Sequence, residues 1–276
     1  MRQMNCGVSH FWRADWFALA ALFLSALAPA TAQLVPPTSN RGVSMGHLHI
    51  RVKDAAAQKK FWTDFGGKAV KNGNLELIEL PGVYVQFRQG DAMGGTVGSV
   101  VNHVGFSVKD SAAMVAKWNA AGIQTEKGNG ATQYYITTAD GLRIEILEDK
   151  AQDIPLKFQH VHFNVTPDAV AEMQAWYARI FDAVPAPPGR FKAGVIAGAN
   201  LTYGESKEKQ EPTKGRALDH IGFDVPSLEF TFAKLQAQGI KFDAEPKVVN
   251  DGRTKNAFLT DPWGTYIELT EGLAPR

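Results

Sequence analysis

The sequence GHLHIRV, residues 46–52, returns three more times along the chain in altered form. The related stretches are NHVGFSV at 102–108, QHVHFNV at 159–165 and DHIGFDV at 219–225. Their leading histidines, His47, His103, His160 and His220, stand 56, 57 and 60 residues apart. Each histidine opens a run of alternating apolar residues, which predicts a β-strand. The regular interval indicates one structural unit repeated four times.

Each unit continues from this strand into a helix and then into shorter strands. Gly66-Gly67 ends the first helix, and Pro167 stands in the first turn of the third. The predicted helices cover 55–66, 111–122, 168–181 and 228–239. The predicted later strands cover 75–80 and 83–89, then 134–138 and 142–148, and finally 257–260 and 265–270.

The units alternate in character. The first and third begin His-x-His, whereas the second and fourth begin His-x-Gly and end on a glutamate in an apolar strand, Glu145 and Glu268. The simplest interpretation is an α+β protein of two domains, each a pair of neighbouring units formed by duplication. We expect the first domain at 45–150, a linker at 151–157 and the second domain at 158–273. Residues 33–44 form a lead-in, and the charged stretch 204–216 is expected to be a solvated linker.

Residues 1–32 have the features of a secretory signal. Arg2 and Arg13 precede an uncharged apolar run from Trp16 to Ala28, and Ala30-Thr31-Ala32 fits a cleavage site. We expect a mature chain exported to the periplasm or secreted; an uncleaved N-terminal anchor is the alternative.

The composition limits the possible partners. The single cysteine, Cys6, lies inside the predicted signal, so a metal in the mature chain would need His, carboxylate, amide or water ligands. Twenty-nine Lys and Arg residues stand against 28 Asp and Glu residues. This balance gives no support to binding of nucleic acid or of a membrane surface after signal cleavage.

Strand alternation gathers polar groups on one face of the sheet. His47 and His49 share a face, as do His160 and His162. Glu145 stands between two isoleucines, so its charge needs a compensating partner. A divalent metal held by two histidines and one carboxylate would supply that partner, and this ligand set suits Fe(II), Mn(II), Zn(II) or Ni(II).

The chain resembles the vicinal oxygen chelate superfamily, which includes glyoxalase I, extradiol dioxygenases and bleomycin-resistance proteins. The similarity covers about residues 45–272. It is carried by the strand-opening histidines, Phe61-Trp62, Trp176-Tyr177, AQGI at 237–240 and DPWGTYIEL at 261–269. It implies four βαβββ modules paired into two glyoxalase-like domains, whose curved mixed sheets form metal-binding cups.

The resemblance also implies ligands, residue by residue. His47, His103 and Glu145 would hold a metal in the first domain, and His160, His220 and Glu268 would hold one in the second. The family's fourth ligand position falls near Gln86 and near Thr202. Glyoxalase-type members usually have an acid there; Gln can coordinate through its amide oxygen, and Thr is a poorer candidate.

The catalytic positions depart further from the family pattern. Extradiol dioxygenases carry a Tyr that corresponds to Tyr135 in one half of the chain and to Phe258 in the other, and neither half has the accompanying histidine. His49 or His162 could serve as acid or base instead, or could simply support the ligands through hydrogen bonds.

The sequence therefore favours an exported, metal-dependent enzyme with glyoxalase-like lyase or isomerase chemistry on a small substrate with vicinal oxygens. An extradiol-type ring-cleaving dioxygenase is one alternative. A non-catalytic, resistance-type binding protein is another, and a third interpretation treats the histidines as relics of the fold. Because Fe(II) is hard to keep outside the cytoplasm, Zn(II) or Mn(II) is preferred. The oligomeric state stays open.

Overall fold

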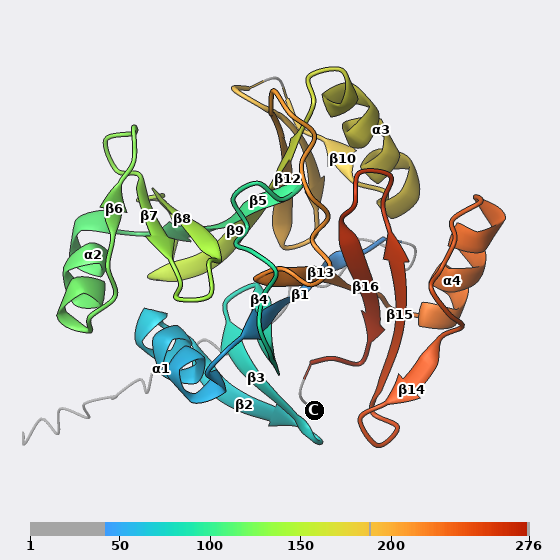
Figure 1. Cartoon of the computed structure of the whole chain (residues 1–276), viewed down its shortest axis with the longest axis horizontal. Coiled ribbons are helices and arrows are strands. Elements are labelled where there is room, and N and C mark those ends of the chain that lie inside the picture. The colour runs from blue at the N-terminus through green and yellow to red at the C-terminus, as the bar shows by residue number, and fades with distance from the viewer. Residues whose placement is uncertain (1–41, 188, 275–276) are drawn as a thin grey trace, which may run out of the picture. The chain divides into compact units, whose positions relative to one another are not determined.

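The computed structural model describes residues 42–187 and 189–274 (Figure 1). The predicted signal at 1–32 lies outside these residues, and so does almost all of the lead-in. None of the helices among the described residues is long and apolar enough to cross a bilayer.

The α+β prediction of four βαβββ modules is confirmed. Each module has a first strand, one helix and three further strands. Module one contains β1 (Ser44–Val52), α1 (Ala55–Phe65), β2 (Lys68–Asn72), β3 (Leu75–Leu80) and β4 (Val83–Gln89). Module two contains β5 (Val101–Val108), α2 (Ser111–Ala120), β6 (Glu126–Lys127), β7 (Tyr134–Thr137) and β8 (Arg143–Glu148). Module three contains β9 (Leu156–Val165), α3 (Ala169–Phe181), β10 (Val184–Pro185), β11 (Lys192–Ile196) and β12 (Ala199–Glu205). Module four contains β13 (Leu218–Asp224), α4 (Leu228–Ala237), β14 (Lys247–Val249), β15 (Thr254–Thr260) and β16 (Tyr266–Glu271).

Short polar side chains start three of the helices. Asp54 accepts hydrogen bonds from the first free amides of α1, Asp110 does so for α2, and Ser227 does so for α4. α3 has no such side-chain cap. Gly66 ends α1 with a φ of 135°, a value that an L side chain rarely adopts.

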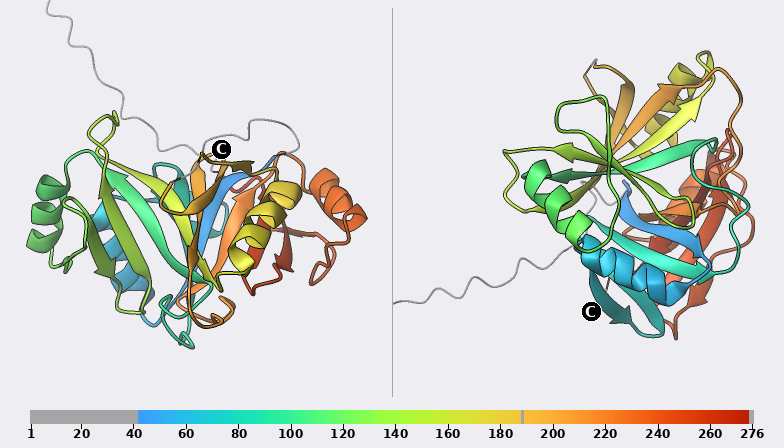
Figure 2. Two further views of the ribbon diagram at one scale, coloured as in Figure 1. Left: turned by 90° about the horizontal axis from the view of Figure 1, so that it is seen from above. Right: turned by 60° about the vertical axis from the view of Figure 1, so that its left-hand side comes forward.

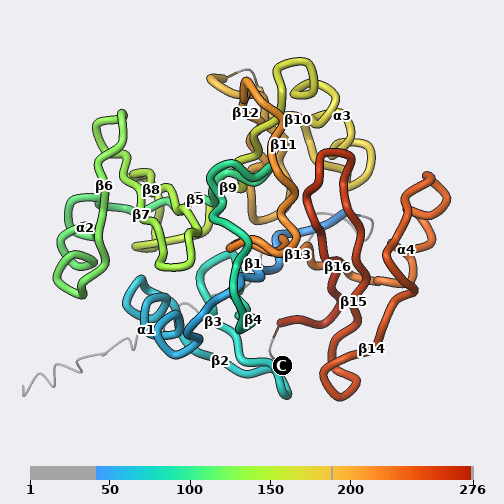
Figure 3. The backbone as a smooth tube through the Cα atoms, viewed as in Figure 1, coloured from blue at the N-terminus to red at the C-terminus, as the bar shows by residue number. Residues whose placement is uncertain are grey.

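The modules pair in an order that the sequence interpretation did not anticipate. One sheet runs β14-β15-β16-β13-β1-β4-β3-β2, and the other runs β10-β11-β12-β9-β5-β8-β7-β6. Module one thus pairs with module four, and module two pairs with module three. In Figure 3 the blue strand β1 lies beside the orange strand β13. The expectation that modules one and two share one sheet, and modules three and four the other, is therefore wrong. Residues 90–100 carry the chain from the first sheet into the second, and residues 206–217 carry it back.

Helix packing, by contrast, joins neighbouring modules. Phe65 of α1 stacks on Trp118 of α2 with ring centroids 4.9 Å apart, and Trp118 donates a hydrogen bond to the Phe65 carbonyl. Figure 2 shows these two helices beside each other. The ammonium group of Lys234 on α4 donates a hydrogen bond to Asp182 at the end of α3. Each half of the chain is thus joined through its helices, while each sheet takes one module from each half.

The strand register explains why only the even modules carry His-x-Gly. β1 and β13 are antiparallel, with His47 opposite Gly222 and His49 opposite His220. A Cβ atom on Gly222 would lie 2.0 Å from Cε1 of His47, so the imidazole occupies the space that a side chain would fill. β5 and β9 repeat this arrangement, with His160 lying over Gly105.

Four irregularities in these ladders fall at the residues just before the four leading histidines. The register skips Gly46 and Asp219 in one pair of strands and Asn102 and Gln159 in the other. A skipped residue is a β-bulge, which interrupts the alternation of faces and re-aims a side chain. Each bulge therefore places the skipped residue on the same side of the strand as the histidine that follows it.

We predict that Gly222→Ala destabilises the protein through its clash with His47. Overpacking of a closed site costs ~1–3 kcal/mol, and urea unfolding monitored by circular dichroism measures it. Gly189→Ala is the control, because its new Cβ atom would meet only ordinary contacts. The double variant His47→Ala/Gly222→Ala should recover part of the loss. Equal unfolding midpoints for Gly222→Ala and Gly189→Ala would contradict this account.

Candidate metal sites

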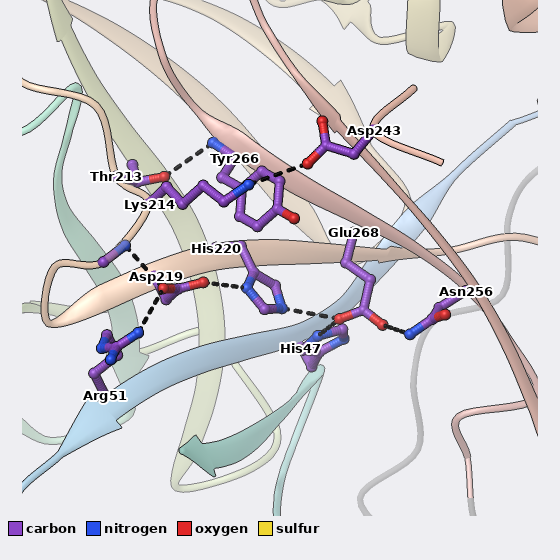
Figure 4. A network of polar contacts seen from close by, with 11 residues as sticks. His47, Arg51, Thr213, Lys214, Asp219, His220, Asp243, Asn256, Tyr266 and Glu268 are labelled. Atoms are coloured by element: carbon purple, nitrogen blue, oxygen red, sulfur yellow. Dashed lines mark hydrogen bonds and ion pairs between the residues drawn. The ribbon is translucent and has the colours of Figure 1, made fainter. Parts of the chain in front are cut away.

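The first sheet gathers one cluster of metal-binding side chains, which we name cup A. It consists of His47 and His49 on β1, His220 on β13 and Glu268 on β16, and their ligand atoms all lie within 4.8 Å of one another. His47 Nε2 lies 3.0 Å and His220 Nε2 lies 2.9 Å from the same Oε2 atom of Glu268 (Figure 4). The two imidazoles thus converge on one carboxylate oxygen.

Neighbouring side chains hold these groups in place. The bulge residue Asp219 lies 2.8 Å from Nδ1 of His220 through its Oδ1 atom, and its other oxygen accepts from the Gly215 amide. Asn256 donates to Oε1 of Glu268 at 2.9 Å. A carboxylate at Nδ1 fixes the ring and presents Nε2 outward, which is how metal-binding histidines are usually supported.

The second sheet builds a related cluster, which we name cup B, from His103, His160, His162 and Glu145. The ligand atoms of the three histidines lie within 4.8 Å of one another. His103 Nε2 and His160 Nε2 each lie 3.2 Å from Oε2 of Glu145. Tyr135 donates to the other oxygen of Glu145 at 2.9 Å.

The supporting contacts of cup B repeat those of cup A. Gln133 donates to Oε1 of Glu145, as Asn256 does to Glu268. The bulge residue Asn102 forms a hydrogen bond with Nδ1 of His103, and the bulge residue Gln159 forms one with Nδ1 of His160. Of the four bulge residues only Gly46 lacks a side chain, so Nδ1 of His47 has no hydrogen-bond partner.

Unsatisfied buried nitrogens indicate that both clusters suit a cation. Both ring nitrogens of His49 and Nδ1 of His47 are buried without a hydrogen bond, and Nε2 of His160 has only the ion-pair contact of 3.2 Å with Glu145. Such groups cost free energy unless a partner satisfies them. Neutral imidazoles gathered around a carboxylate are a donor set for a divalent metal, so the residues present fit the ion that their chemistry suggests.

The structure places each predicted histidine and glutamate ligand in one cup or the other, but it sorts them differently. His47 meets His220 and Glu268, whereas His103 meets His160 and Glu145. The expected sets of His47 with His103, and of His160 with His220, are wrong. They assumed that module one pairs with module two, and module three with module four.

The predicted fourth ligand position can be located from the parallel registers. Gln86 on β4 lies opposite His49 on β1, just as Glu268 on β16 lies opposite Gly222 on β13. Gln86 and Glu268 therefore occupy equivalent places in the two modules of one sheet. Thr202 has the same relation to Glu145 in the other sheet, since it lies opposite His162. Coordination by Gln86 stays a prediction.

Cup A opens onto a cavity of about 560 Å³. Its wall includes His49, His220 and Glu268 of the cup, together with Gln86. Other polar lining residues are Arg51, Arg88, Lys214, Asp219, Asp243, Asn256 and Tyr266. A cavity of about 680 Å³ lies beside cup B, but it is lined by Gln133 and Gln159 rather than by the histidines.

Electrostatics keep the extra histidines neutral. Burial, and then the charge of His220 and His47, lowers the pKa of His49 to about 3. Burial and the neighbouring histidines of cup B lower the pKa of His162 to about 3. Burial would raise the pKa of Glu268, yet His47 and His220 hold it well below its ordinary value. Each cup thus combines a neutral second imidazole, His49 or His162, with an ionised carboxylate.

Tyr135, the third predicted catalytic residue, lies in cup B. Burial, and then the charge of Glu145, raises its pKa to about 12, so it stays protonated and donates to that carboxylate. In cup A the equivalent place opposite the glutamate belongs to Phe258. Catalytic roles for His49, His162 and Tyr135 stay predictions.

The sequence patterns did not predict a role in the sites for several residues. Asp219 and Asn256 support cup A, and Lys214 stands on the cavity wall with its ammonium 4.0 Å from the centre of the Tyr266 ring and 3.1 Å from Asp243 (Figure 4). Lys214 belongs to the stretch expected to be a solvated linker. A signal for Asp219 was present, because polar residues precede three of the four leading histidines.

Comparisons with known proteins agree with this geometry. Residues 44–269 match the family model described as the Glyoxalase/Bleomycin resistance protein/Dioxygenase superfamily. No curated protein sequence matches at a significant level. Glyoxalase I from Zea mays is similar in structure, with a TM-score of 0.65 at 16% identity over 83% of this chain and 92% of that one. A Bacillus subtilis protein named as a candidate dioxygenase gives a TM-score of 0.64 at 14% identity over 86% and 87% of the two chains. At these identities the structural likeness concerns the fold.

We predict that the metal-free protein loses stability as pH falls from 7 to 5. In the unfolded chain His49 and His162 bind protons below about pH 6.5, but in the folded protein each stays neutral down to about 3. Between these values the unfolded state holds more protons, so each histidine contributes a slope of up to about 1.4 kcal/mol per pH unit. His220 opposes them, because bonds to Asp219 and Glu268 outweigh burial and raise its pKa. Its stabilisation is present at low pH and is lost as pH rises through the folded pKa.

Urea unfolding in the presence of a chelator at pH 5, 6 and 7 measures this dependence. His49→Gln and His162→Gln should each flatten it. A variant with the same pH dependence as the wild type would show that the replaced imidazole is not held neutral.

Proposed function

Because the chain belongs to the Glyoxalase/Bleomycin resistance protein/Dioxygenase superfamily, we propose that it is a divalent-metal-dependent enzyme. Its reaction takes place in cup A, on a small molecule with two neighbouring oxygen atoms. The chemistry is of the glyoxalase-like lyase or isomerase kind.

One observation carries this proposal: the convergence of His47 and His220 on Glu268 coincides with an open cavity of about 560 Å³. A metal held only for stability needs no such space, because structural sites are closed whereas catalytic sites keep open positions. The cavity is large enough for a small ligand, whose pockets start at roughly 300 Å³.

The chain's own residues have separable tasks. His47, His220 and Glu268 hold the metal, and Asp219 and Asn256 orient two of these ligands. When bound, the metal acts as a Lewis acid that stabilises negative charge developing on the substrate oxygens. Lys214 presents N–H donors at the cavity wall, where they can bind an anionic part of the substrate.

The alternative of extradiol dioxygenation finds less support in cup A. Phe258 stands where that activity would use a tyrosine, and Asn250–Asp251 stand where it would use a histidine. Tyr135 keeps the tyrosine position in cup B, but its hydroxyl is bonded to Glu145. We therefore place non-oxidative chemistry in cup A.

We propose further that the enzyme is exported. This proposal is based on residues 1–32 alone, whose apolar run and small residues fit a cleaved signal. Mass spectrometry of the protein recovered from expressing cells would then show a mature chain that begins at Gln33.

The metal content of paired variants tests both the cups and the module pairing. We predict that the wild type binds about two equivalents of Zn(II) per chain, since each cup holds a complete set of ligands. His47→Ala/His220→Ala should keep about one equivalent, because both changes fall in cup A. His47→Ala/His103→Ala should keep almost none, because that pair disables both cups. Mass spectrometry of the native protein and elemental analysis give the counts.

The proposal fails if the wild type holds no stoichiometric divalent metal and a chelator leaves its melting temperature unchanged. Activity on hemithioacetals and related vicinal-oxygen compounds then separates an enzyme from a sequestering protein. An enzyme working in cup A loses turnover in His220→Ala and keeps most of it in His103→Ala. Metal binding without turnover of any such compound would favour the non-catalytic, resistance-type role.

A further inference from the structure

His49 is the one histidine of cup A whose two ring nitrogens are both buried without a hydrogen bond. It lies on the same face of β1 as His47, and its ring lies 4.3 Å from that of His220. A ligand nitrogen of His49 lies within 4.8 Å of the ligand atoms of His47, His220 and Glu268. The side chain is therefore directed at the cluster and has no other partner to satisfy it.

We propose that His49 is a third imidazole ligand, so that cup A binds its metal through three histidines and one glutamate. This inference rests on the proposed function, because it requires that cup A bind a metal. Two residues apart on one strand, His47 and His49 project to the same side, so both rings can reach one ion. Coordination would satisfy the nitrogen that is otherwise left buried and unpaired.

The competing candidate for a fourth ligand is Gln86, which lies opposite His49 on the neighbouring strand. An imidazole nitrogen is the better donor for Zn(II), Co(II) or Ni(II), whereas amide oxygens suit harder ions such as Ca(II). No side-chain atom of Gln86 is among the buried polar atoms that lack a hydrogen bond, whereas both ring nitrogens of His49 are. Leaving Gln86 uncoordinated therefore costs little free energy, whereas leaving His49 uncoordinated leaves two buried nitrogens without a hydrogen-bond partner.

Cup B supplies an internal comparison. His162 occupies the place equivalent to His49, since it lies opposite His103 as His49 lies opposite His220. Unlike His49, it has no ring nitrogen that is buried without a hydrogen bond. Asn164 lies two residues further along its own strand, and the ring of Phe191 stands edge-on to it at 5.0 Å. In module one the place of Asn164 belongs to Arg51, whose guanidinium bonds the Asp91 carbonyl instead. An imidazole whose two ring nitrogens both lack a hydrogen bond is thus specific to cup A.

The ligand set has a consequence for the substrate. Three neutral imidazoles and one carboxylate leave a divalent ion with a net positive charge, whereas two carboxylates would neutralise it. A positively charged centre favours a ligand that chelates as an anion, such as an ionised hydroxy-ketone or hydroxy-acid. We therefore assign cup A to anionic chelating substrates.

Co(II) alone is a suitable probe, because its visible absorption reports coordination and its X-ray absorption reports the number of imidazoles. We would titrate it into a chain whose cup B is disabled by His103→Ala/His160→Ala. His49→Ala should lower the Co(II) affinity at least about tenfold, as loss of a ligand contact does, and should reduce the imidazole count from three to two. Gln86→Ala, which removes the competing candidate on the neighbouring strand, should weaken Co(II) binding much less than His49→Ala does. Free imidazole should restore the visible spectrum of His49→Ala by filling the vacated space.

The inference is overturned if His49→Ala binds Co(II) like its parent, or if Gln86→Ala takes the larger loss. If the cup B variant does not fold, the wild type and His49→Gln are compared with both cups loaded, and the mean imidazole count should fall by about one half per Co(II). An unchanged count contradicts the inference. A wild type that binds no Co(II) overturns the proposed function itself, whereas binding that is indifferent to His49 overturns only this assignment.

Discussion

The antiparallel pairing of first strands from opposite halves of the chain is the constraint on which both sites depend. β1 meets β13 and β5 meets β9 in registers that place an imidazole over a glycine in each pair. On the other side of that glycine, a parallel strand contributes the glutamate. Loss of the pairing would separate His47 from both His220 and Glu268, so the strand pairing that builds the fold also assembles the candidate metal site.

The β-bulges orient the histidines that the strand pairing brings together. A regular strand would turn Asp219 away from His220, but the bulge places both on one side, so that a carboxylate can hold the imidazole. Asn102 and Gln159 act in the same way in cup B. Gly46 cannot, which leaves His47 less firmly oriented. The two unpartnered nitrogens of His49, and a cavity that reaches His49, His220 and Glu268, are further differences between cup A and cup B.

The sequence predicted the modules and the histidines and glutamates that gather in the two cups, because hydrophobic periodicity and a fourfold repeat are local signals. It could not predict which modules pair. An antiparallel match of His-x-His with His-x-Gly needs one odd and one even module, and neighbouring modules satisfy that as well as the first and fourth do. Contacts such as Phe65 on Trp118, which join neighbouring modules through their helices, have no periodic signature. The bulges were missed because alternation assigns Asp219 to the face opposite His220.

A crystal of the protein soaked with Zn(II) and measured at the zinc absorption edge tests the central claim most directly. The account predicts an anomalous peak between Nε2 of His47, Nε2 of His220 and the carboxylate of Glu268, with ligands drawn from both halves of the chain. A peak coordinated jointly by His47 and His103, or a chain whose first strand pairs with the strand of module two, would contradict it.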